Sequence, residues 1–200
     1  SVKQAAQLEN IDYIIKLENE IDSELFLNNT NSYQGITTGD NSQFVNMFWE
    51  IENINNQWEY FQSTGNEPIH FSGMNKILLW QNGEGYLAGS QAARIQGQSV
   101  WGKAGVAVNQ MGSLPCAINS GYPWDMNCAK LIPNNHTDLP AIWAFCASSE
   151  YNESVRKIDQ SLAVTNATLV KIPFDLERWQ KVADEQYPNG LPKPYTNDLT

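Results

Sequence analysis

Polar side chains that can hydrogen-bond to nucleic-acid bases and phosphates are concentrated in one stretch of the chain. Residues 85–124 contain no aspartate or glutamate, although the 200 residues carry 22 acidic and 12 basic side chains. Arg and Lys suit guanine edges or phosphates, and Gln suits adenine edges, because their donors and acceptors match. The candidate residues of this stretch are Arg94, Gln96, Gln98, Lys103 and Gln110. Strand alternation predicts the first three on one face, although a solvated strand face with glycine turns explains the same pattern.

A second candidate is the loop YQGITTGDNSQF, residues 33–44. Gly35 and Gly39 permit positive φ or the close approach of another backbone. The polar candidates in this loop are Thr37, Thr38 and Asn41, whose side chains donate and accept hydrogen bonds. We interpret the loop as a polar platform that holds phosphates or orders the reading surface, and a plain hairpin tip is the alternative.

The sequence shows no grouped catalytic or metal-binding constellation. His70 and His136 lie in separate predicted loops, outside any HExxH or nucleophile-elbow pattern. The segment NGEGYLAG, residues 82–89, superficially resembles a phosphate cradle but lacks the GxGxxG spacing and the P-loop lysine, so we interpret it as a turn. We therefore expect no catalytic residue and no metal ligand.

Cysteine usage and hydropathy indicate a cytoplasmic protein. The three cysteines form no CxxC pair, so neither a disulfide framework nor a structural zinc is supported, and reduced thiols fit a cytoplasm. No apolar run approaches the roughly 18 residues of a membrane helix, so we expect no membrane partner. The chain opens without methionine or a signal sequence, and we expect it to be a piece of a longer protein.

Short apolar segments separated by glycine-, asparagine- and proline-rich turns predict an irregular β-rich region. The predicted strands lie within 43–51, 57–63, 76–80, 93–102, 105–118 and 128–133. The last third has the apolar spacing of helices. Its predicted elements are helices over 138–150, 149–162 and 175–187 and a short strand over 165–174. Asp138 and Asp175 are the expected N-caps of the first and last of these helices.

This order of elements predicts an α+β fold, with an irregular β-rich recognition head followed by C-terminal helices. Apolar spacing also predicts a helix over residues 3–27. We therefore divide the chain into an N-terminal helical linker, residues 1–32, and one domain, residues 33–200. The domain is expected to be β-rich over 33–134 and helical over 135–200.

Several stretches resemble, in order, the target-recognition domain of adenine-specific DNA methyltransferases of the Taq type. YQGITTGDNSQF is similar to the Gly-x-x-Thr-Gly-x-Asn-x-x-Phe motif that opens this domain. The stretches ILLWQNGEG, ARIQGQSVWGKAGVAVNQMGSLPCAI, DLPAIWAFCASSEYNESVRKIDQ and LAVTNATLVKIPFDLERWQKVADEQYPNGLPKPY look like the corresponding region of fused restriction-modification enzymes. TNATLVKIPF is also similar to the close of type I specificity-subunit recognition domains. The resemblance covers residue 33 to the end.

The resemblance implies sequence-specific recognition of double-stranded DNA for a catalytic methyltransferase domain in the same chain. Full-length members transfer a methyl group from S-adenosylmethionine to the exocyclic amine of adenine, and some also cleave DNA. The Asn-Pro-Pro-Tyr/Phe quartet, the cofactor loop and the nuclease core are absent from these 200 residues. We therefore expect a non-catalytic chain that binds no cofactor itself, and cleavage by the parent enzyme stays open.

Two other classes of protein fit the composition. The net charge of −10 argues at first against nucleic acid as a partner. A protein-interaction module, for example a scaffold that binds partner subunits in a phage-defence complex, is the main alternative. A secreted sugar-binding domain fits the 7 tryptophans, because indole rings stack on sugars. The odd number of cysteines weighs against secretion.

Overall fold

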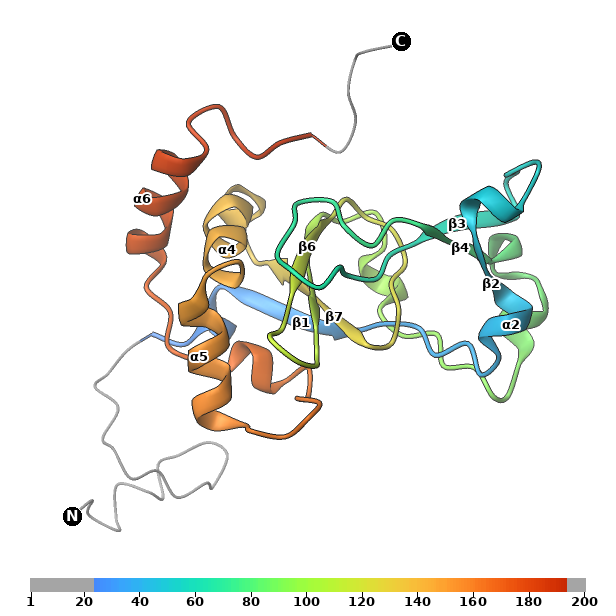
Figure 1. The fold of residues 1–200 in the computed structure, drawn as a ribbon, viewed down its shortest axis with the longest axis horizontal. Coiled ribbons are helices and arrows are strands. Elements are labelled where there is room, and N and C mark those ends of the chain that lie inside the picture. Colours follow the sequence, from blue (N-terminus) through green and yellow to red (C-terminus); the bar gives the residue numbers. More distant parts are fainter. Residues whose placement is uncertain (1–23, 194–200) are drawn as a thin grey trace.

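The structure, a computed structural model, describes residues 24–193 (Figure 1). Within these residues the chain forms a 4-stranded sheet in the order β1-β7-β5-β6 and a 3-stranded sheet in the order β2-β4-β3, both antiparallel. The longer helices follow the strands in the chain and lie on the side of the larger sheet away from the smaller one (Figure 1). The predicted α+β class with C-terminal helices is confirmed.

The strands occupy the region where short extended segments were expected. They are β1 (Thr30–Gln34), β2 (Val45–Met47), β3 (Trp58–Phe61), β4 (Lys76–Leu79), β5 (Gly105–Asn109), β6 (Cys116–Asn119) and β7 (Cys128–Pro133). The helices are α2 (Asn41–Phe44), α3 (Tyr86–Gly89), α4 (Leu139–Cys146), α5 (Ser149–Ile158) and α6 (Leu176–Gln186). The 3-10 turns are η1 (Phe26–Asn28), η2 (Phe48–Glu50), η3 (Gln81–Gly83), η4 (Gln98–Val100), η5 (His136–Asp138) and η6 (Thr168–Val170).

The main core lies between the larger sheet and α4. Val106 and Val108 of β5 and Leu131 of β7 share one apolar cluster with Ile142 and Phe145 of α4. Every residue of β7 is buried, because this strand is central in the sheet and covered on both faces. Burial of this apolar surface is the dominant favourable term in folding, so the sheet and helices stabilise one another.

The first described residues belong to this core. The Phe26 ring is fully buried, with its centroid 5.1 Å from that of Phe145 and 4.7 Å from that of Phe174. Residues 24–32 are thus part of the fold, although we expected residues 1–32 to form a linker. The predicted helix over residues 3–27 lies mostly outside the described residues, and its last residues start the turn η1.

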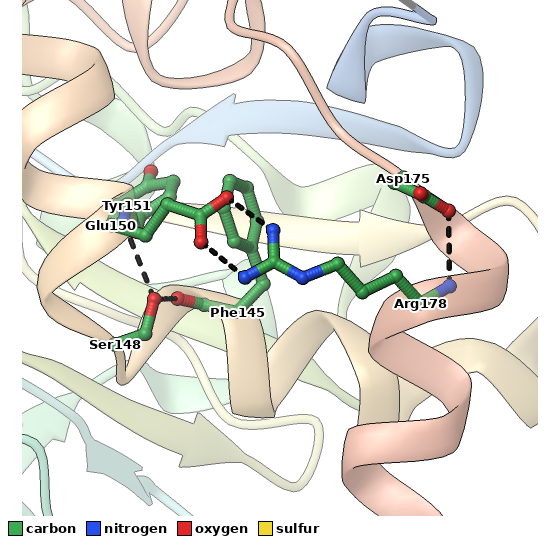
Figure 2. A network of polar contacts seen from close by, with 6 residues as sticks. All are labelled: Phe145, Ser148, Glu150, Tyr151, Asp175 and Arg178. Carbon is green, nitrogen blue, oxygen red and sulfur yellow. Dashed lines mark hydrogen bonds and ion pairs between the residues drawn. The ribbon is translucent and has the colours of Figure 1, made fainter.

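Capping contacts and an ion pair set the positions of α5 and α6. Figure 2 shows Ser148, whose hydroxyl accepts from the backbone N–H of Tyr151, and Asp175, whose carboxylate accepts from the N–H of Arg178. The Arg178 guanidinium donates to both oxygens of Glu150, at 2.8 and 2.6 Å, and so joins α6 to α5. The pair is exposed, so it contributes less than about 1 kcal/mol.

Of two local predictions in the helical part, one is confirmed in position only and the other is wrong. Asp138 is the N-cap residue of α4, but its carboxylate makes no capping hydrogen bond and instead accepts from the Gln180 side chain at 2.9 Å, across the α4–α6 contact. Residues 165–174 do not form a strand, because η6 interrupts them. Leu169 and Val170 of this turn are both buried in the main core, whereas successive side chains of a strand would point to opposite faces.

The smaller sheet has its own apolar cluster, which includes Ile36, Phe44, Phe61 and Leu78. The strand predicted over 43–51 is shorter than expected, since α2 and η2 flank β2.

The loop after β3, residues 62–75, connects the smaller sheet to the larger sheet. The Ile69 N–H donates to the Cys116 carbonyl, and the Ile118 N–H donates to the His70 carbonyl at 2.6 Å. The His70 ring packs on Trp143 of α4, with centroids 4.7 Å apart. The two sheets are therefore parts of one folded unit.

No helix among residues 24–193 is long and apolar enough to cross a membrane.

Candidate nucleic-acid interface

The loop of residues 33–44, called the TTG loop here, joins two distant segments of the chain. Its Ile36 N–H donates to the Trp124 carbonyl at 2.8 Å. Thr37 and Arg94 exchange both backbone hydrogen bonds, at 3.1 and 2.8 Å. The loop is thus paired on both sides, and the alternative of a free hairpin tip does not describe it.

The two glycines of the TTG loop are needed for close packing. A Cβ on Gly35 would lie 2.3 Å from the carbonyl oxygen of Asp125. Gly39 has φ of +77°, and a Cβ there would lie 2.8 Å from the Cβ of Ala92. Any side chain at either position would push the loop away from its neighbours.

Residues 94–98 do not form the predicted strand. Arg94 makes a single bridge to Thr37, and η4 begins at Gln98. The physical cause is Gly97, whose φ of +70° ends the extended conformation, and whose absent Cβ makes room for the Trp124 ring.

Exposure nevertheless alternates along this segment. Arg94, Gln96 and Gln98 are exposed. Ala93 and Ile95 point inward and pack against the core of the smaller sheet. The exposure of these three side chains agrees with the expectation, but the strand that would place them on one face is absent.

Lys103 follows η4 and is also exposed. Within the described part of the chain, no hydrogen bond or ion pair engages the side chains of Arg94, Gln96, Gln98 and Lys103. We call these residues, together with the TTG loop, the reading surface. Its long polar side chains are available to an external partner.

The polar residues of the TTG loop divide into buried and exposed. Thr38 is only 4% exposed, and its hydroxyl donates to the Asn41 side-chain oxygen at 2.6 Å. This contact orients Asn41, which is exposed, while Thr37 is half-buried. Thr38 therefore acts by ordering the loop, and Asn41 keeps its amide N–H groups free for a partner.

Asp40 places a negative charge beside these groups. Its side chain accepts from the hydroxyl of Ser42 at 2.5 Å and from the N–H of Gln43 at 3.3 Å, where it caps α2. The Ser42 hydrogen bond, as the largest cause, lowers the pKa of Asp40 below its usual value. An ionised carboxylate thus borders the reading surface and disfavours a phosphate at that edge.

Gln110 does not belong to the reading surface. It is 9% exposed, its amide nitrogen donates to the Val164 carbonyl at 2.9 Å, and its amide oxygen accepts from Gln34 at 2.9 Å. Both ends of the amide are used within the chain, so Gln110 connects the end of β5 to the C-terminal part. We therefore remove it from the candidate residues.

A pocket beside the TTG loop was missed in the sequence. It is open, has a volume of about 600 Å³ and lies between α2 and α3. Its side chains are those of Gln43, Phe44, Gln81, Glu84, Tyr86 and Ser90. The segment NGEGYLAG supplies part of this pocket. The sequence signal that could have indicated the pocket is Tyr86, a large aromatic residue inside a predicted turn.

The described residues offer little for acid-base or metal chemistry. Within residues 24–193 no three His, Cys, Asp or Glu side chains gather where they could hold a metal ion. His70 packs against Trp143 and lies 3.3 Å from the Tyr187 hydroxyl, and burial lowers its pKa. Burial raises the pKa of Cys116 and of Cys128 to about 12, so neither thiol is a ready nucleophile.

Comparison with known proteins assigns the chain to no family. No protein-family model matches the chain, and none of the curated proteins matches it significantly. The functional proposal therefore depends on the geometry of the reading surface and on the motif resemblance.

Proposed function

We propose that this chain is the DNA target-recognition domain of an adenine-specific DNA methyltransferase or fused restriction-modification enzyme, without a catalytic role of its own. The reading surface is the observation that carries the proposal. Two segments that are far apart in the sequence are hydrogen-bonded at Thr37 and Arg94, and the second segment carries the exposed Gln96, Gln98 and Lys103 after Arg94. One of these segments belongs to the stretch without carboxylates, residues 85–124.

The side chains suit two kinds of contact with duplex DNA, one with base edges and one with phosphates. Arg94 can donate two hydrogen bonds to a guanine edge, and Gln96 and Gln98 can pair with adenine edges in the major groove. Lys103 is suited to phosphate oxygens, which position a protein without reading sequence. Asn41, at the start of α2, stands next to the Asp40 carboxylate and is therefore better suited to an uncharged group.

The catalytic steps belong to another part of the proposed enzyme. A methyltransferase domain of the same chain would bind S-adenosylmethionine and flip the target adenine, while this domain reads neighbouring bases. The proposal places the protein in the cytoplasm, where it meets DNA.

Selection from a randomised duplex library tests the proposal. The purified chain is mixed with the duplexes at low salt, and the bound fraction is sequenced. We expect enrichment of a short motif and a weak affinity that falls between low and physiological salt, because Arg and Lys side chains that contact phosphates release counterions. Binding without sequence enrichment, or no binding at all, would contradict a recognition role.

A protein-interaction module is the second candidate. The Phe48 and Trp49 rings are exposed and in contact, with centroids 5.0 Å apart, and Glu50 and Glu52 lie beside them in the sequence. An exposed aromatic pair of this kind is typical of a protein contact. In the proposed enzyme this patch would face another domain rather than DNA, because its carboxylates repel phosphates.

A further inference from the structure

The open pocket beside the TTG loop borders the reading surface through one short helix. Asn41 begins α2 on the reading surface, and Gln43 and Phe44, two and three residues later, line the pocket. Phe44 is buried and forms an apolar wall, whereas Gln43 is exposed. A ligand bound at Asn41 would therefore lie beside this pocket.

The opposite wall of the pocket has a strained backbone. Gln81 and Asn82 have φ of +52° and +55°, and Gly83 follows with +81°. This conformation is unfavourable for residues with a Cβ, and such strain is concentrated at ligand sites. A Cβ on Gly85 would lie 2.1 Å from the amide oxygen of Gln81, so this glycine leaves the space that the amide occupies.

The pocket presents unpaired hydrogen-bonding groups next to a flat ring. In the described part of the chain, the amides of Gln43 and Gln81 and the carboxylate of Glu84 have no hydrogen-bond partner. The Tyr86 side chain is 82% exposed, so its ring offers a face for stacking. None of the residues that line the pocket is basic, and Glu84 repels phosphate. The preferred ligand is planar, uncharged and able to donate and accept hydrogen bonds.

We propose that this pocket binds an unstacked nucleobase. The base stacks on Tyr86, the amides of Gln43 and Gln81 contact its edge, and Glu84 accepts from an exocyclic amine. This chemistry favours adenine and cytosine over thymine, which has no exocyclic amine. We infer that the base belongs to a nucleotide displaced from the duplex that the reading surface holds, and this part of the inference rests on the proposed function.

Free nucleosides test the pocket without any need for duplex recognition. Deoxyadenosine, deoxycytidine, thymidine and methyl glucoside are titrated into the full chain and followed by amide chemical shifts. We expect deoxyadenosine or deoxycytidine to bind more tightly than thymidine, and Glu84→Gln to remove that preference. Tyr86→Ala should weaken binding roughly tenfold through the loss of one stacking contact.

The matched control is Tyr60→Ala, because Tyr60 is an exposed tyrosine on β3 outside the pocket. It should leave nucleoside binding unchanged. Absence of nucleoside binding, equal weakening by both tyrosine variants, or tighter binding of methyl glucoside would overturn the proposal, and the last result would identify a sugar site.

A duplex with one bulged adenine separates this proposal from the proposed function. We expect the bulged duplex to bind more tightly than the fully paired one, and Tyr86→Ala to abolish only that difference. If nucleosides bind but neither duplex does, the pocket is a base site and the recognition role fails. If both duplexes bind equally and nucleosides do not bind, the recognition role stands and the pocket inference fails.

Discussion

At the scale of single residues, Lys130 is the most unusual side chain of the fold. It is 0% exposed in the central strand β7, its ammonium nitrogen has no hydrogen-bond partner among residues 24–193, and it lies 5.0 Å from the centroid of the Trp124 ring. Burial lowers the pKa of Lys130 to about 7. The contact with the indole face offsets only part of the cost of removing the charge from water.

Replacing Lys130 with methionine should therefore stabilise the protein. The unfolded lysine has a pKa of about 10.4, so between pH 7 and 10 the unfolded state binds more protons and stability rises with pH. Below about pH 7 the lysine is protonated in the folded and the unfolded state, so the full free-energy cost of burying its charge remains. Lys130→Met should raise the free energy of unfolding at pH 7 by a few kcal/mol, with about 5 kcal/mol as the upper bound from 1.36 kcal/mol per pKa unit.

Urea unfolding at several pH values measures this effect. The matched control is Lys157→Met on α5, where the lysine is exposed, and it should change neither stability nor its pH dependence. A destabilised Lys130→Met variant would show that the ammonium group has a stabilising role that its surroundings do not reveal.

The reading surface makes a second prediction at the residue scale. Arg94→Ala or Gln96→Ala should lose roughly 1–3 kcal/mol for the preferred site and relax preference at one or two base positions. Lys103→Ala should weaken binding to all sequences about equally and reduce the salt slope by about one. Library selection with each variant measures both effects. The controls are Lys157→Ala and Gln160→Ala, because these two exposed side chains lie in α5 and just after it. Unchanged site preference in all variants would place the reading residues elsewhere.

At the scale of elements, the TTG loop is positioned by backbone contacts that tolerate no side chain at Gly35. Gly35→Ala should destabilise the protein by about 1–3 kcal/mol, because the new Cβ would overlap the Asp125 carbonyl. The control is Gly89→Ala, where a Cβ would meet nothing within 4 Å. Thermal unfolding of the two variants gives the comparison. Equal stability would mean that the loop moves away from Asp125 at little cost.

At the scale of the whole molecule, the β-rich part and the helical part should unfold together. The main core mixes residues of both, for example Val106 with Ile142, and the loop after β3 packs His70 against Trp143. We expect one calorimetric transition whose van't Hoff and calorimetric enthalpies agree. Two separated transitions would show that the helices have a core of their own.

Local patterns in the sequence were sufficient for many elements of the fold. Apolar runs between turn residues located β3, β4 and β7, and helical spacing with a capping Asp175 located α6. These features depend on residues within one or two turns of each other, so the chain encodes them locally. Exposure of Arg94 and Gln96 also followed from alternation alone.

The tertiary structure decided the features that depend on contacts between distant residues. Gly97 ends the expected strand because the Trp124 ring occupies the space beside it. Gln110 is held away from the reading surface by hydrogen bonds with Gln34 and with the Val164 carbonyl, which lie far from each other in the sequence. Local spacing carries no information about which distant groups will meet, because long-range packing chooses among conformations that are locally similar in energy.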